Sequence, residues 1–352
     1  MKKRMRNVLV GRAEDHGPET DPPVAGPNPL AEPFRIGPVE IANRIVQAPL
    51  AGIANRVFRT QSRRHGAGAT VSEMVASMGV VHGNRKTRGM LAIEPGEGPV
   101  GIQLFGPNPE PMAEAARAVE EAGADFVDIN MGCPVKKVCT TGAGAAMLAD
   151  PENAARVIEA MVRAVDIPVT VKMRRGLTPE DARPVEIARR FEAAGAAAIF
   201  LHPRAAAEEY EGTADHRITA EVAAAVSVPV VASGDIVGPA DARRVLGETG
   251  CAAVAIGRGA LGYPWLFGDL AAGVSRARPG LDEVVAEVEA FAAGAADHLG
   301  ADRACSYMRK FYPWYLAGHR TPPGTLEALV RAPTLDEALD LLRTAVAVPS
   351  PA

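Results

Sequence analysis

A cysteine fixed between a glycine and a proline is the residue of this sequence most clearly placed to do chemistry. A hydrophobic β run that includes Phe126, Val127 and Ile129 enters the stretch Asp128–Pro134 and stops abruptly at Gly132, and Cys133 follows directly. Gly132 permits unusual backbone torsions, and Pro134 restricts both its own φ and the conformation of Cys133. The pattern predicts a side chain at the carboxyl end of a strand, where α/β enzymes carry their functional groups. The alternative is a structural cysteine buried in a tight turn.

Three other polar side chains lie within or at the end of predicted apolar strands. Gln103 is near the end of the third strand, where its amide could meet the donor and acceptor edge of a heterocycle, or simply be exposed. Lys172 is inside the fifth strand, and because a buried unpaired ammonium is costly, we expect it to face a ligand or to be paired. His202 ends the sixth strand, where it could hold an anion or cap the strand.

Glycine-containing segments follow the seventh and eighth predicted strands. They are Ser233-Gly234-Asp235 and Gly257-Arg258-Gly259. TIM barrels build phosphate sites at these two strands, from glycine amides and a following helix N-terminus, and Arg258 can add a charge-assisted contact. Ordinary turn chemistry also explains glycines after strands. Because both segments fall at strands seven and eight, the pattern favours phosphate binding.

These positions together describe a phosphorylated planar cofactor that lies across a barrel mouth, with Cys133 at its centre. The small apolar segment Pro49-Leu50-Ala51, after the first strand, suits the underside of a flat ring. FMN fits this arrangement, with its phosphate at strands seven and eight and its ring over strand one. Lys172 would lie at the N1/O2 edge and stabilise the anionic reduced ring.

The elements that must position these residues alternate between strands and helices. Strands are predicted at 43–52, 70–73, 100–104, from 126, and at 168–173, 197–202, 229–232 and 252–256. Helices are predicted from the cap Asn55 to 64, at 109–122, from Asp150-Pro151, and at 179–194, 217–226 and 239–247. Eight strands with this spacing predict an α/β fold, a TIM (β/α)8 barrel. The runner-up is an open doubly wound sheet, but G-x-G-x-x-G is absent after the first strand.

The chain divides into three predicted regions. Residues 1–32 mix charges, glycine and proline, and we expect a mobile N-terminal extension. Residues 33–272 form the barrel, an FMN-binding catalytic domain. Residues 275–346 form a small C-terminal helical domain, with helices expected at 281–299, 302–316, 325–330 and 335–346 because their apolar spacing is helical.

Composition limits the class of protein. Hydrophobic residues make up 47% and charged residues 23% of the 352, which is ordinary for a globular enzyme, and no apolar run is long enough for a membrane span or a signal peptide. Four widely spaced cysteines without C-x-x-C argue against a metal site or a disulfide framework and for a reducing cytoplasm. The net charge of −4 does not by itself indicate a nucleic-acid partner, although a local basic face would be enough to bind nucleic acid. We favour a monomer.

An ordered set of motifs, which covers most of the chain after residue 33, resembles the tRNA-dihydrouridine synthases, and most of all their bacterial B-type branch. The motifs are Ala48-Pro49, Ser72-Glu73-Met74, Gly101–Gly106, Asn130–Pro134, Val171–Arg174, Ser233–Ile236, Gly257-Arg258, Met308-Arg309-Lys310 and Trp314-Tyr315. No single motif is decisive, but the ordered set is highly specific.

The resemblance implies FMN-dependent reduction of the C5–C6 double bond of selected uridines in tRNA, with NADPH or NADH as the reductant. Cys133 would donate the proton to C5, since a thiol of ordinary pKa is largely protonated at neutral pH. Asn130 and Arg174 would hold the uracil. The implied FMN-binding residues are Pro49, Leu50, Ala51, Gln103, Lys172, His202, Ser233, Gly234, Asp235, Gly257 and Arg258.

Basic residues near the barrel mouth and in the tail are the candidates for tRNA contacts. The principal candidates are Lys136, Lys137, Arg309 and Lys310, and Arg174, Arg175, Arg204, Arg303 and Arg320 are further ones. The alternative is a scatter of solvated charges. Trp314 and Tyr315 could stack on RNA or pack the tail against the barrel.

Two segments depart from the family pattern. Cys139-Thr140-Thr141-Gly142 stands where many relatives have a basic residue before glycines, and Pro203-Arg204-Ala205-Ala206 replaces the common G-R-T-R. Two contacts to RNA or to the flavin phosphate would then be lost or moved. Two other functions compete with the first: an FMN-dependent TIM-barrel oxidoreductase acting on a small pyrimidine or enone, and a non-catalytic tRNA-binding protein.

Overall fold

Eight parallel strands close into a barrel in the computed structural model, which describes residues 27–347, with side chains to 345. The strands are β3 (Ile45–Gln47), β4 (Ala69–Val71), β6 (Val100–Phe105), β7 (Phe126–Met131), β8 (Val169–Arg174), β9 (Ala198–His202), β10 (Val230–Ser233) and β11 (Ala253–Ile256). Each pairs with its neighbour in this order, and β11 pairs with β3 to close the barrel. The short β5 (Val75–Ala76) extends the sheet beside the end of β6. The predicted TIM barrel is therefore confirmed.

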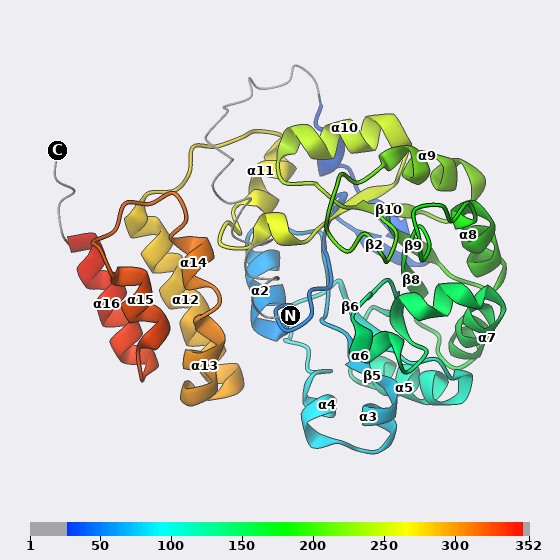
Figure 1. Cartoon of the computed structure of the whole chain (residues 1–352), viewed down its shortest axis with the longest axis horizontal. Helices are drawn as coiled ribbons and strands as arrows, with labels where there is room; N and C mark the ends of the chain where they lie inside the picture. Colours follow the sequence, from blue (N-terminus) through cyan, green and yellow to red (C-terminus); the bar gives the residue numbers. More distant parts are fainter. Residues whose placement is uncertain (1–26, 348–352) are drawn as a thin grey trace.

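Helices surround the strands (Figure 1). They are α2 (Arg56–Arg64), α3 (Ser77–Val81), α4 (Arg85–Gly89), α5 (Pro109–Glu121), α6 (Lys136–Cys139), α7 (Pro151–Val162), α8 (Pro184–Ala193), α9 (His216–Ala225), α10 (Pro239–Thr249) and α11 (Leu266–Ala272), with the 3₁₀ helices η1 (Pro29–Ala31), η2 (Gly144–Ala149) and η3 (Arg258–Ala260). The predicted caps are confirmed: Asn55 Oδ1 accepts from Phe58 N at 3.2 Å, and Asp150 Oδ1 accepts from Asn153 N at 3.0 Å.

Helix α8 begins later than the sequence predicts. The expected start at Pro179 is wrong, because the segment before Pro184 folds into turns instead. Asp181 Oδ1 accepts from Arg183 N at 3.2 Å, and the Arg183 guanidinium folds back onto the same carboxylate. A local side-chain bond of this kind competes with the helix ladder.

The barrel interior is filled at its amino-terminal end. A hairpin of β1 (Phe34–Ile36) and β2 (Val39–Ile41) contributes apolar side chains to the same cluster as Phe126 and Phe200. A Cβ on Gly101 would lie 2.2 Å from the Phe126 ring, so only glycine fits there. The interior is thus a packed core, and a ligand can enter only from the carboxyl ends of the strands.

Ordered structure begins before residue 32. Residues 1–26 of the predicted mobile extension lie outside the described residues. Leu30 is fully buried, and the Asn28 side-chain amide donates to the carbonyls of Leu270 (2.8 Å) and Ala271 (2.9 Å) at the end of α11.

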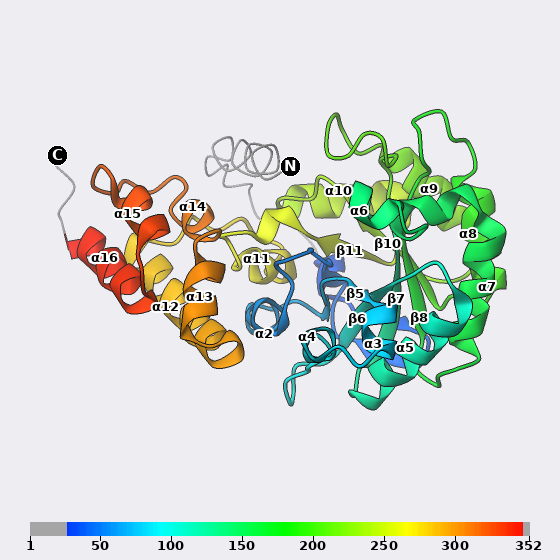
Figure 2. The same ribbon diagram turned by 60° about the horizontal axis from the view of Figure 1, so that its bottom comes forward.

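Five helices follow the barrel and form a second body beside it (Figures 1 and 2). They are α12 (Leu281–Leu299), α13 (Ala301–Met308), α14 (Tyr312–Tyr315), α15 (Thr325–Arg331) and α16 (Leu335–Ala347). The expected single helix over 302–316 is wrong: the chain turns after Met308 and restarts at Tyr312. Pro313, which has no backbone N–H, fits the first turn of the new helix.

The helical tail is attached to the barrel through α2 and the loop before it. Phe58 of α2 packs in one apolar cluster with Phe291 and Phe311 of the tail. Tyr307 Oη donates to the carbonyl of Ile53 at 2.8 Å, and Gln61 Nε2 donates to Tyr315 Oη at 2.6 Å. Within residues 27–347 we find no helix long and apolar enough to cross a bilayer.

Candidate active site

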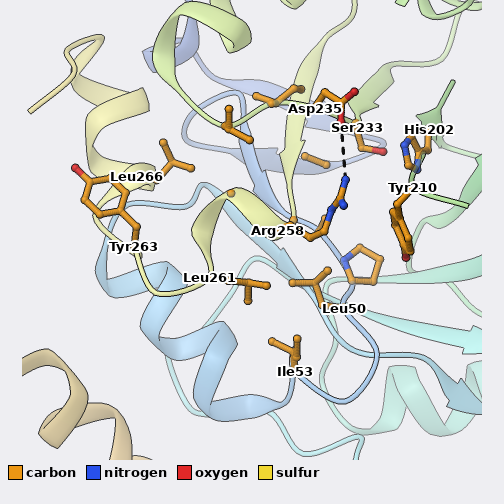
Figure 3. Close-up of a pocket in the computed structure, with 18 of the residues that line it drawn as sticks. Leu50, Ile53, His202, Tyr210, Ser233, Asp235, Arg258, Leu261, Tyr263 and Leu266 are labelled. Carbon is orange, nitrogen blue, oxygen red and sulfur yellow. Dashed lines mark ion pairs between the residues drawn. The ribbon is translucent and has the colours of Figure 1, made fainter. Parts of the chain in front are cut away.

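A pocket of about 1250 Å³ opens at the carboxyl ends of the strands (Figure 3). Its walls come from side chains on β6 and β8, from the loops after β3, β4, β7, β9, β10 and β11, and from tail residues such as Trp314. Every residue that the sequence suggested for cofactor or uracil binding lines it, and so do Cys133 and Lys136. Lys137, Arg309 and Lys310 do not. The closed barrel explains why these residues line one pocket, because the carboxyl ends of all eight parallel strands lie at the same end of the barrel.

The first rim of the pocket lies after β10 and β11 and is built from backbone geometry. Gly234 and Asp235 both have positive φ, 113° and 51°. A Cβ at Gly234 would lie 2.8 Å from the His202 ring, so this turn requires glycine. The 11-residue helix α10 begins a few residues later, and Arg258 follows Gly257 at the neighbouring strand end. Turn amides, a helix N-terminus and a guanidinium are groups that can together bind an anion, and we refer to them as the anion-binding corner.

Arg204 holds this corner together from inside. Its side chain is buried and makes two bonds to the Asp235 carboxylate, at 3.0 and 2.5 Å, while Arg258 lies 3.8 Å from the same carboxylate. It also donates to the carbonyls of Glu211 (2.9 Å) and Gly212 (2.6 Å), which ties the loop after β9 to the rim. Two guanidiniums thus lie against the Asp235 carboxylate, one fully buried and one facing the pocket.

The interpretation of Arg204 as an RNA contact is therefore wrong. Its guanidinium is fully engaged within the protein, where no phosphate can reach it. Arg174 is likewise buried, and it donates to the carbonyls of Gly132 (3.0 Å), Ala205 (2.7 Å) and Glu209 (2.7 Å). Arg174 thus braces the Cys133 turn against the same loop.

The second rim lies after β7 and β8 and carries Cys133. Asn130 Oδ1 accepts from the backbone N–H groups of Gly132 (3.2 Å) and Cys133 (2.9 Å), which fixes the turn. Burial raises the pKa of the Cys133 thiol above its usual range. The thiol therefore keeps its proton at neutral pH, as a general acid must.

Charged groups surround this thiol. Burial and the neighbouring Arg174 lower the pKa of Lys172 to about 8. Burial raises the pKa of Asp128 to about 7, although its bonds to Thr170 and Gln103 work in the opposite direction. Burial, followed by the charge of Lys172, keeps the pKa of His202 well below its usual value, so His202 is a neutral ring in the pocket wall.

The four principal candidates for RNA contacts fall into two pairs. Lys136 and Lys137 are exposed on α6, directly after the Cys133 turn. In the tail, Arg309 donates to the Ala332 carbonyl at 2.9 Å. Lys310 donates to the Gly52 carbonyl and lies 4.2 Å from the centre of the Tyr307 ring. The tail pair therefore makes intramolecular contacts, while the α6 pair faces solvent.

Several site residues escaped the reading of the sequence. Tyr210 stands at the mouth, 40% exposed, with its ring 4.6 Å from the Arg258 guanidinium carbon. Asp128, buried in β7, was not among the residues that the sequence suggested for the site. The described residues contain no group of three or more His, Cys, Asp or Glu side chains that could hold a metal ion. A carboxylate in the middle of a strand was the one available signal for Asp128, since a buried acid requires a partner.

An eight-stranded parallel barrel with its polar groups at the carboxyl ends defines a TIM-barrel enzyme. Solved structures agree on the fold: histamine dehydrogenase from Rhizobium sp. 4-9 superposes with a TM-score of 0.58, at 15% identity, over 76% of this chain and 51% of that one. A 2-naphthoyl-CoA reductase superposes with a TM-score of 0.56, at 13% identity, over 71% of this chain and 54% of that one.

Sequence comparison is more specific. The family model for dihydrouridine synthase matches residues 46–347. tRNA-dihydrouridine synthase B of Pseudomonas aeruginosa is 40% identical over 304 residues, 83% of this chain and 89% of that protein. A probable tRNA-dihydrouridine synthase of Rhodobacter capsulatus is 43% identical over 311 residues, 86% and 94% of the two chains. The chain belongs to the dihydrouridine synthase family, and membership implies the use of a flavin and a reduced nicotinamide.

Proposed function

We propose that this enzyme reduces the C5–C6 double bond of uridine in tRNA to 5,6-dihydrouridine, with FMN as its flavin and NADPH, or NADH, as its reductant. The observation that carries the proposal is a protonated thiol, Cys133, held in a pocket whose opposite rim suits a phosphate. The family and the tRNA-modifying relatives support the choice of substrate.

The residues present fit FMN. The anion-binding corner, formed by Ser233–Asp235 and Gly257-Arg258 with the N-terminus of α10, would hold the phosphate. Pro49, Leu50 and Ala51 would lie under the ring. Lys172, Gln103 and His202 would lie at its polar edges. When bound, reduced FMN supplies a hydride for C6 of the uracil.

Cys133 supplies the proton. As the hydride adds to C6, the C5–C6 π electrons take the thiol proton, and C5–H forms while S–H breaks. Lys172 and Arg174 stabilise the thiolate that remains, since both charges lower the pKa of Cys133. Solvent then returns a proton to the sulfur. We assign Asn130 and Arg174 to the placement of the uracil, with Asn130 Nδ2 as a donor that now faces the weak acceptor Met74 Sδ at 3.7 Å.

The tRNA would lie across the barrel mouth and the tail, and the target uridine must leave its stack to enter the pocket. Lys136 and Lys137 would contact phosphates beside the entry. Arg309 and Lys310, which the sequence suggested as RNA contacts, donate to the carbonyls of Ala332 and Gly52, so we assign to them the further role of holding the tail in place. We accordingly propose residues 33–272 as the catalytic domain and 275–346 as the tRNA-binding domain, in a monomeric cytoplasmic enzyme with four free cysteines.

The test is anaerobic stopped-flow spectroscopy of the purified yellow protein. NADPH should bleach the flavin, and tRNA from a strain that lacks dihydrouridine should restore its colour and acquire dihydrouridine. Equally fast recovery with a small pyrimidine or enone would support the oxidoreductase alternative. A protein that neither binds FMN nor is reduced by NADPH, yet binds tRNA, would support the non-catalytic alternative.

A further inference from the structure

A continuous chain of side-chain hydrogen bonds runs from the barrel interior to the Cys133 turn. Thr170 Oγ1 lies 2.6 Å from Asp128 Oδ1, and Asp128 Oδ2 accepts from Gln103 Nε2 at 2.7 Å. Gln103 Oε1 accepts from Asn130 Nδ2, also at 2.7 Å. Asn130 Oδ1 then accepts from the amides of Gly132 and Cys133. Asp128 and Gln103 are each 1% exposed, so water does not compete for these bonds.

This chain has a direction, because a primary amide donates from nitrogen and accepts at oxygen. Asp128 Oδ2 is an acceptor, so it requires the nitrogen of Gln103, whose oxygen then requires the nitrogen of Asn130. At the far end the backbone amides are donors, so they require the oxygen of Asn130. A flip of either amide would place donor against donor within a buried network, which is costly.

The direction survives a change in the protonation of Asp128. When the carboxylate is ionised, the Thr170 hydroxyl donates to Oδ1. When a proton resides on Oδ1, the hydroxyl can rotate and accept it, since a hydroxyl is both donor and acceptor. In both states Oδ2 still accepts from Gln103, so the raised pKa of Asp128, about 7, leaves the network intact.

We propose that Asp128 is a positioning residue: through Gln103 and Asn130 it sets which amide atoms face the pocket and holds the Cys133 turn in register. Both amide oxygens already accept hydrogen bonds inside this network, so the groups that Gln103 and Asn130 can offer to the pocket are N–H donors. They therefore select ligand edges that carry carbonyl oxygens. This inference rests on the proposed function, because uracil and the flavin ring both present such edges.

The first experiment removes the acceptor and keeps the branching and the number of side-chain heavy atoms. Asp128→Leu should slow flavin reoxidation by tRNA roughly tenfold to a hundredfold, the loss expected from a misplacement of about 1 Å. Reduction of the FMN-saturated variant by NADPH should stay within about threefold of wild type, because that step does not use the Cys133 turn. Thr170→Val is the matched control. It removes a bond to the same carboxylate but leaves Oδ2 available, so both half-reactions should stay within about threefold of wild type.

The second experiment tests the direction of the chain. Asp128→Asn should retain wild-type reoxidation within about threefold, since its oxygen can face Gln103 while its nitrogen donates to Thr170. In the double variant Asp128→Asn/Thr170→Val that nitrogen has no acceptor, so the amide is free to flip. The double variant should lose reoxidation by more than the product of the two single effects.

The outcomes separate this proposal from the proposed function. Failure of the wild-type protein to be reoxidised by tRNA would count against the function. With an active wild type, normal reoxidation by Asp128→Leu would overturn the positioning role. Loss by Asp128→Leu together with an equal loss by Asp128→Asn, or additive behaviour of the double variant, would overturn the directional network. Circular dichroism and melting temperature identify a variant that fails to fold, and in that case the Asn and double variants decide alone.

Discussion

The two rims of the pocket differ in the groups that they present, backbone groups at one rim and side chains at the other. The rim after β10 and β11 offers mainly backbone groups, namely a turn with two residues of positive φ and the N-terminus of α10. Arg258 adds one side chain, beside the Asp235 carboxylate that Arg204 holds. The rim after β7 and β8 relies on side chains, whose amides are oriented by a buried acid. The first rim suits a fixed anion, and the second suits a group that changes its protonation state.

The difference implies that damage at one rim should leave the other working. Loss of a contact at the first rim should lower cofactor affinity and leave the chemistry of a saturated enzyme intact. Loss at the second rim should impair proton transfer and leave the cofactor bound. The following predictions test this division, from the largest expected effect to the smallest.

Cys133→Ala should remove the proton donor of the second rim and leave the first rim unaffected. The variant should bind FMN and be reduced by NADPH normally, but its reoxidation by tRNA should fall about 10²- to 10⁴-fold, since a positioned general acid is lost. Stopped-flow reoxidation measures this. Cys139→Ala is the neighbouring control, with its Sγ 3.3 Å from the Cys133 carbonyl, and should remain close to wild type. A Cys133→Ala enzyme that reoxidises at the wild-type rate would show that the thiol is only structural.

Asp128→Asn should remove the pH dependence of stability that the buried Asp128 carboxyl group causes. Because folding raises the pKa of Asp128 to about 7, the folded state holds its proton more tightly than the unfolded state. The wild-type free energy of unfolding should therefore fall, relative to the variant, as pH rises from about 4 to about 7, by at most about 4 kcal/mol. Urea unfolding of the cofactor-free proteins at several pH values measures the difference. A difference that does not change with pH would contradict the raised pKa.

Arg258→Ala should weaken the binding of the cofactor phosphate at the first rim. Removal of a charge-assisted phosphate contact should weaken FMN binding by roughly 1.5–3 kcal/mol. With FMN at saturating concentration, tRNA-dependent reoxidation should return close to the wild-type rate. Fluorescence titration gives the affinity. Arg276→Ala, at an arginine of the same pocket that pairs with Asp269 away from this corner, is the control. Unchanged FMN affinity in Arg258→Ala would remove Arg258 from the phosphate site.

Charge reversal on α6, which lies outside both rims, should affect tRNA binding and leave the cofactor site unchanged. Lys136→Glu/Lys137→Glu should weaken tRNA binding and reduce its dependence on salt, because fewer counterions are released. FMN content should not change. Arg156→Glu/Arg163→Glu is the matched control, since Arg156 is exposed on α7 and Arg163 is exposed at the C-cap of the same helix. Equal weakening by the two pairs would indicate a general charge effect and no local contact.

The sequence predicted the barrel and the membership of the pocket for one physical reason. Apolar runs locate strands, and in a closed parallel barrel all carboxyl ends meet, so the residues after each run must share a surface. Local caps such as Asn55 and Asp150 were predictable because their partners lie three residues away. The roles of Arg204 and Asp128 were not, since each depends on partners about 25 to 45 residues away, whose distances only the folded chain sets.

The attachment of the tail has a consequence for modularity. Tyr307 and Lys310 reach the carbonyls of Ile53 and Gly52, in the loop that begins with the proposed bed of the flavin ring. Gln61 of α2 bonds to both Tyr315 and Glu287. A tail grafted from a relative would therefore meet a foreign α2 surface and disturb the cofactor bed. The unit that can be transplanted is the tail together with residues 50–64, and recombination within the family should preserve that pair.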